Sequence, residues 1–80
     1  MDPQANLQDL LAAVEERDWD RVDQLSETLL SWVQKRGFPP TTVGPPSLGR
    51  GWHRAVTEFV CYLAQSRARD SRKHRRHRGG

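Results

Sequence analysis

Residues 3–36 read PQANLQDLLAAVEERDWDRVDQLSETLLSWVQKR, and their apolar residues repeat with the period of an α-helix. In the first part of this stretch they recur every three or four positions, at Leu7, Leu10, Leu11 and Val14. Asp2 and Pro3 suit a helix start, because an aspartate accepts free backbone N–H groups and a proline lacks one. The sequence predicts a helix over about 3–16.

A second helix is predicted over about 19–36. Asp18 can cap its start, and acidic residues in its first turn lie at the positive end of the helix dipole. Its main apolar residues keep helical spacing, at Val22, Leu25, Leu29 and Trp32. Because only two or three residues join the two helices, residues 3–36 are predicted to form an antiparallel αα-hairpin.

The segment from Gly37 to Gly51 holds four of the five prolines and four of the six glycines, so it is predicted to be a loop. Phe38, Val43 and Leu48 are the loop residues expected to pack onto the core. A third helix is predicted over about 51–66, on the helical spacing of Trp52, Ala55, Val56, Phe59, Val60 and Leu63.

The predicted fold class is all-α, with a single domain over 1–66 and a basic, flexible or helical tail over 67–80. The pattern leaves open whether the third helix frays after Gln65 or continues to about residue 76, since Arg and Lys are good helix formers. The apolar stripes, with their three tryptophans, are expected to face a shared core. A tryptophan left exposed would mark a surface for a partner.

Length and composition limit the possible classes of protein. Eighty residues with 35 % hydrophobic side chains can form one small domain, and the single Cys61 excludes an internal disulfide. Neither a signal peptide nor an apolar run of membrane-spanning length is visible, so we expect a soluble, cytoplasmic protein. Such a small core is marginal alone, which favours association with a second copy.

The residues that could carry chemistry are few. Cys61 lies in an apolar helical stretch, where a cysteine is usually a small buried hydrophobe. His74 and His77 stand three residues apart, but basic neighbours there would repel a metal cation. We therefore expect no catalytic residues, no metal and no cofactor, and a protein that acts by binding.

The first functional hypothesis is a helical module for protein interaction or oligomerisation. Its partner would be a second copy, forming a homodimer, or another helical protein. Burial of apolar residues against that partner would add about 25 cal/mol per Å² to a thin core. The candidate interface residues are Leu30, Val33, Trp52 and Tyr62.

The alternative is sequence-independent binding of RNA or DNA by the tail. Residues 1–34 carry eight acidic and two basic side chains, whereas residues 35–80 carry eleven basic and two acidic ones. The tail resembles the arginine-rich segments that fold in RNA grooves, and blocks of like charge are often interaction tails. Its candidate contacts are Arg67, Arg69, Arg72, Lys73, Arg75, Arg76 and Arg78.

An anionic membrane is not expected as a partner. A basic amphipathic third helix could lie on such a surface only if Trp52, Phe59 and Leu63 were exposed, and the need for a core argues against that.

Overall fold

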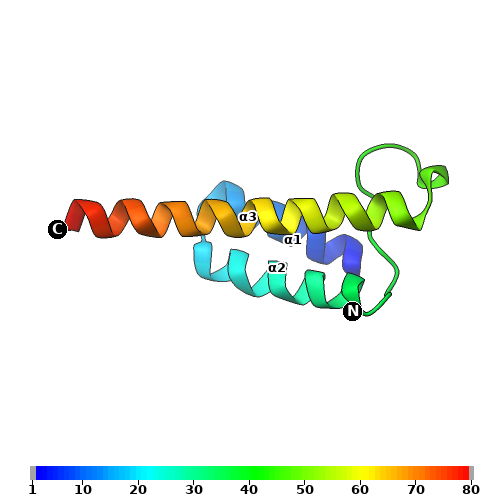
Figure 1. Ribbon diagram of the computed structural model, residues 1–80, viewed down its shortest axis with the longest axis horizontal. Coiled ribbons are helices and arrows are strands. Elements are labelled where there is room, and N and C mark those ends of the chain that lie inside the picture. The colour runs from blue at the N-terminus through cyan, green and yellow to red at the C-terminus, as the bar shows by residue number, and fades with distance from the viewer. Residues whose placement is uncertain (1, 80) are drawn as a thin grey trace.

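A computed structural model of the chain describes the backbone of residues 2–79 and the side chains of residues 2–72. It contains α1 (Pro3–Glu16), α2 (Trp19–Gln34), a short 3₁₀-helix η1 (Pro46–Leu48) and α3 (Arg50–Gly79), and no strand within residues 2–79 (Figure 1). The predicted all-α hairpin followed by a third helix is confirmed. None of the helices in the described part of the chain is both long and apolar enough to span a bilayer.

The hairpin forms through the caps that the sequence suggests. The Asp2 carboxylate accepts hydrogen bonds from the backbone N–H groups of Gln4 and Ala5 at 3.1 and 3.3 Å. α1 ends at Glu16, the following Arg17 adopts the left-handed conformation with φ 59°, and Asp18 caps α2. The chain therefore reverses within two residues, and α2 returns along α1.

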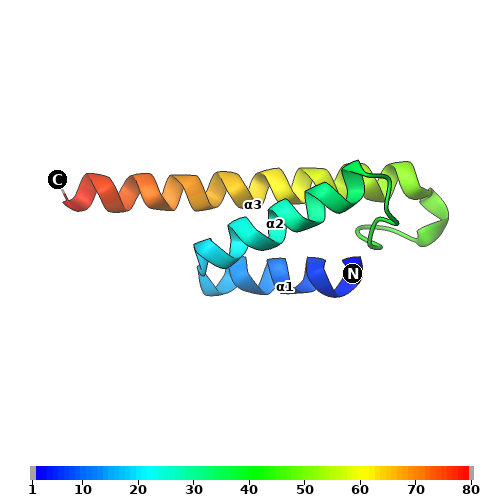
Figure 2. The ribbon, with the colours of Figure 1, turned by 90° about the horizontal axis from the view of Figure 1, so that it is seen from below.

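α2 is the central helix, because it packs against α1 on one side and α3 on the other (Figure 2). Leucine, valine and tryptophan side chains of the hairpin form most of the core. The buried apolar residues of α1 and α2 are Leu7, Leu10, Ala13, Trp19, Val22, Leu29, Leu30 and Val33. Of the apolar residues predicted for 3–36, four are buried, Leu11 is exposed, and Val14, Leu25 and Trp32 are partly buried.

α3 contributes small side chains to this core. We call its buried side the inner face, and its residues are His53, Thr57, Cys61, Ala64 and Ala68. Ala68 is fully buried, so the helix packs on the hairpin beyond Ser66. Of the two ends that the sequence left open, the structure shows the longer one, and α3 continues to Gly79, since no helix-breaking residue stands between Ser66 and Gly79.

The loop between α2 and α3 is held by hydrogen bonds from α1 and α3. Gln4 and Thr41 bond reciprocally, with the Thr41 N–H donating to Gln4 Oε1 at 2.9 Å and Gln4 Nε2 donating to the Thr41 carbonyl at 3.2 Å. The expectation that Phe38, Val43 and Leu48 pack onto the core is wrong, because all three are exposed. Polar bonds, and not apolar burial of these residues, hold the path of the loop.

Candidate interaction surface

Large apolar side chains line the side of α3 that faces away from the hairpin. We call this side the outer face, and its residues are Trp52, Ala55, Val56, Phe59, Tyr62 and Leu63. Phe59 is 68 % exposed, Tyr62 and Leu63 are each 52 % exposed, and Trp52 is 48 % exposed. Since a helix turns about 100° per residue, these positions lie opposite the inner face. Among the residues whose side chains are described, α3 therefore has two apolar sides, of which the inner one is buried and the outer one is largely exposed. The hairpin lies along one side of α3 (Figure 2).

This arrangement corrects the expectation that the helical stripe from Trp52 to Leu63 faces the core. Trp52, Phe59 and Leu63 are exposed, and only Val60 of that stripe packs against the core as a partly buried residue. Small residues occupy the inner face because they allow α3 to approach the large side chains of α2 closely.

The predicted interface residues divide into two pairs. Leu30 and Val33 are buried within the three-helix unit, with Val33 completely enclosed. Trp52 and Tyr62 lie on the outer face, where about half of each side chain is exposed. Phe59 and Leu63 are at least as exposed as these two, although neither was predicted as an interface residue.

The indole of Trp52 is fixed in place at the start of α3. Its Nε1–H donates a hydrogen bond to the Val43 carbonyl at 2.8 Å. The side chains of Leu48 and Trp52 both approach Gly44, so η1 lies beside the indole. Val43 and Leu48 are exposed apolar residues of this loop.

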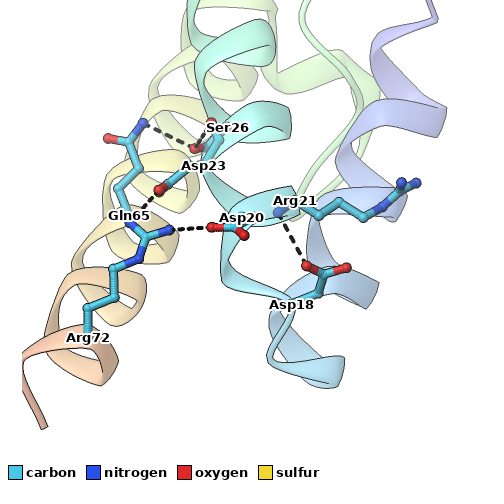
Figure 3. A network of polar contacts seen from close by, with 7 residues as sticks. All are labelled: Asp18, Asp20, Arg21, Asp23, Ser26, Gln65 and Arg72. Atoms are coloured by element: carbon cyan, nitrogen blue, oxygen red, sulfur yellow. Dashed lines mark hydrogen bonds and ion pairs between the residues drawn. The ribbon is translucent and has the colours of Figure 1, made fainter. Parts of the chain in front are cut away.

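Polar contacts join α2 to the second half of α3 (Figure 3). Arg72 Nη1 donates to Asp23 Oδ2 at 2.6 Å, and Nη2 donates to Asp20 Oδ1 at 3.0 Å. The hydrogen bond to Asp23, with its charge, raises the pKa of Arg72 above its ordinary value, and Asp20 contributes less. Gln65 Nε2 donates to the buried Ser26 hydroxyl at 3.1 Å. Acidic α2 thus neutralises one of the seven bases proposed as nucleic-acid contacts.

The other basic candidates are placed differently. Arg67 and Arg69 are exposed on α3. The side chains of Lys73, Arg75, Arg76 and Arg78, like those of His74 and His77, lie outside the described residues, although their backbone belongs to α3.

Cys61 lies on the inner face and is fully buried as a free thiol. Burial raises the pKa of the thiol to about 11, and the nearby charge of Glu58 acts in the same direction. The thiol is therefore protonated at neutral pH, the form that is a poor nucleophile.

His53 holds the loop against α3, a role that the sequence did not indicate. Its Nδ1 accepts a hydrogen bond from the Thr42 N–H at 3.1 Å, and its Nε2 donates to the Pro45 carbonyl at 3.0 Å, since a carbonyl can only accept. Among residues whose side chains are described, no three His, Cys, Asp or Glu are grouped to hold a metal ion.

Comparison of the chain with protein-family models, with curated proteins and with solved structures gave no match.

Proposed function

We propose that this protein is a small binding module that recognises a helical protein partner through the outer face of α3. The supporting observation is the exposure of Trp52, Phe59, Tyr62 and Leu63 on the side opposite the core. An aromatic side chain offers about 150–250 Å² of surface. The exposed parts of the three aromatic side chains and of Leu63 together amount to roughly 400–500 Å². The largest apolar patch on a monomer is often of this size and is often a functional surface.

The chemistry of the outer face suits a protein interface. Aromatic residues are enriched among the side chains that contribute most to binding, and Trp52 and Phe59 are spaced by two helical turns. The bond from Trp52 to Val43 holds the indole in one orientation before a partner arrives, which lowers the entropy lost on binding. A partner helix can place its own apolar residues between those of the outer face.

Photo-crosslinking tests this proposal whatever the identity of the partner. A benzophenone amino acid replaces Phe59 in one variant and Leu11 in the matched control, because Leu11 is 52 % exposed but lies on α1. Irradiation in the cells that express the chain is expected to give protein adducts from position 59 only. Absence of adducts at position 59, or equal adducts from both positions, contradicts the proposal.

Binding of RNA or DNA by the basic end of α3 is a second candidate function. It is favoured by one observation, which is that α3 continues as one helix to Gly79 and projects beyond the hairpin (Figure 1). Arg67 and Arg69 are exposed at the base of this projection. Basic residues on a projecting helix can follow phosphates without reading the base sequence.

Fluorescence anisotropy with labelled RNA and DNA, at roughly 0.05 and 0.2 M salt, tests the second function. A chain that ends at Arg72 is the informative comparison, because it keeps the buried Ala68 and the ion pairs to α2. The full chain is expected to bind with a salt slope of roughly −0.7 to −0.9 per phosphate contact, and the shortened chain with a smaller slope. Equal affinity and slope for both chains contradicts a function for the tail.

A further inference from the structure

We infer that the occupant of the outer face is a second copy of this chain, whose α3 lies antiparallel to the first. This inference rests on the proposed function, since it names the partner of the same surface. It follows from the spacing, the sizes and the charges of the residues on and beside that face.

The spacing of the outer face is the same in both directions. Its central row is Trp52, Val56, Phe59 and Leu63, with intervals of four, three and four residues. A twofold axis midway along this row exchanges its two ends, so each position meets another member of the row. Intervals of four and three are also those that let two helices interlock over several turns.

Size complementarity supports the same register. The twofold axis places Trp52 against the second copy's Leu63 and Val56 against the second copy's Phe59. Each large ring of the row is thus opposite a smaller side chain, so the two helices can approach without two rings competing for one space.

Charge selects the antiparallel arrangement over the parallel one. Parallel helices would bring the two basic segments that follow Ser66 side by side, where they repel. In the antiparallel pair these segments lie at opposite ends of the dimer. Arg67 and Arg69 of one copy then lie toward the start of the second copy's α3, away from the basic segment that ends it.

The area available fits a weak dimer. The outer face supplies roughly 400–500 Å² on each partner, which is below the about 800 Å² of a standard interface and in the range of weak, transient contacts. A contact of this size predicts a weak dimer, which forms only in concentrated solution.

Sedimentation of the full chain tests self-association. The chain is used at roughly 0.1 mM, which exceeds the micromolar dissociation constants of modest interfaces. The mass expected under these conditions is twice 9.2 kDa. Phe59→Glu introduces two charges per dimer and is expected to raise the dissociation constant at least about 100-fold. Leu11→Glu introduces the same charge at an exposed position of α1 and is expected to leave the dissociation constant unchanged. A monomer at every concentration overturns the inference.

Cysteine crosslinking tests the orientation in a Cys61→Ala background. Trp52→Cys and Leu63→Cys chains are expected to form a disulfide when mixed, and neither is expected to form one alone. Disulfides formed by each variant alone would indicate parallel helices and overturn the inference. The Cα separation of a disulfide, about 4.4–6.8 Å, makes this readout specific for register.

The failure of self-pairing is distinguishable from the failure of the proposed function. A monomer that still gives adducts with a different protein from position 59 refutes the second copy and retains the binding module. Binding of the monomer to vesicles of phosphatidylserine and phosphatidylcholine, abolished by Phe59→Glu, would refute both and assign the outer face to a membrane surface. Dimer formation with adducts of the chain to itself supports both.

Discussion

The two sides of α3 are both apolar, yet one is buried against the hairpin and the other is exposed. The inner face carries Thr57, Cys61, Ala64 and Ala68 and is buried, whereas the outer face carries Trp52, Phe59 and Leu63 and is exposed. If hydrophobicity alone decided, the outer face, with its larger apolar side chains, would be the buried one. The difference teaches that the size of the side chains decides which side packs, because small residues allow a helix to approach the hairpin closely.

The hairpin explains why small residues are required on α3. α1 and α2 already fill the core with fully buried leucine and valine side chains, such as Leu10, Val22 and Leu29. A third helix that added large rings to this core would be held further from α2 and would lose the polar contacts from Gln65 and Arg72. The large residues of α3 are thus left for contacts outside the monomer.

The same substitution on each side of α3 gives the largest contrast. Ala64→Glu puts an unpaired carboxylate into the core and is expected to lower the free energy of unfolding by about 3–5 kcal/mol. Ala55→Glu on the outer face is the matched control, with an expected change within about 0.5 kcal/mol. Urea unfolding followed by circular dichroism, in dilute solution, measures both. Comparable losses from the two variants would contradict the assignment of the faces.

The loop anchor at the start of the inner face gives the next largest effect. His53→Ala removes the bonds to Thr42 and Pro45 and leaves a cavity, with an expected loss of about 2–3 kcal/mol. Hydrogen exchange at the Thr42 amide is expected to accelerate, because that N–H loses its acceptor. Unchanged exchange there would show that other contacts hold the loop.

The buried thiol makes the inner face sensitive to alkaline pH. Below about pH 9 Cys61 is protonated in both the folded and the unfolded chain, so its contribution to stability is complete. Between pH 9.0 and about 11 the unfolded chain ionises and the folded chain does not, so stability falls as pH rises, by roughly 2 kcal/mol in total.

Urea unfolding of the natural chain and of Cys61→Ala at several pH values measures this loss. The variant is expected to lack the thiol contribution while keeping that of every other titrating group. If the free energy of unfolding fell equally with pH in the two chains, the result would contradict the proposed effect of burying the thiol.

The ion pairs at the end of the packed region give the smallest effect. Arg72→Ala removes its bonds to Asp20 and Asp23, which are exposed and screened by salt. The midpoint of unfolding is expected to change little, while amide exchange in α3 just after Ala68 increases at low salt. If molar salt does not reduce the difference in amide exchange between the natural chain and Arg72→Ala, the ion pairs do not explain that difference.

Much of the fold follows from local sequence signals. Asp2, Pro3 and Asp18 mark the starts of the two hairpin helices, because capping depends on neighbouring residues alone. The packing of α3 on the hairpin beyond residue 66 has no such marker, since it depends on Ala68 finding a place against the core. Long-range contacts of this kind have no local signature.

The candidate surface was only partly predictable for a related reason. Both sides of α3 keep helical spacing, at 52, 56, 59 and 63 and at 57, 61, 64 and 68. Choosing between them requires knowing how much room the hairpin leaves. The role of His53 was equally hidden, because its partners Thr42 and Pro45 are set by the path of the loop.

Gly37, where the chain leaves α2, limits how this sequence can vary over evolution. A side chain at this position would overlap the indole ring of Trp32, whose Nε1–H donates to the Phe38 carbonyl at 2.7 Å. Even alanine could be accommodated only if the ring moved away and gave up that bond. Positions 32 and 37 are therefore expected to change together in related sequences, with a smaller residue at 32 accompanying the loss of glycine at 37.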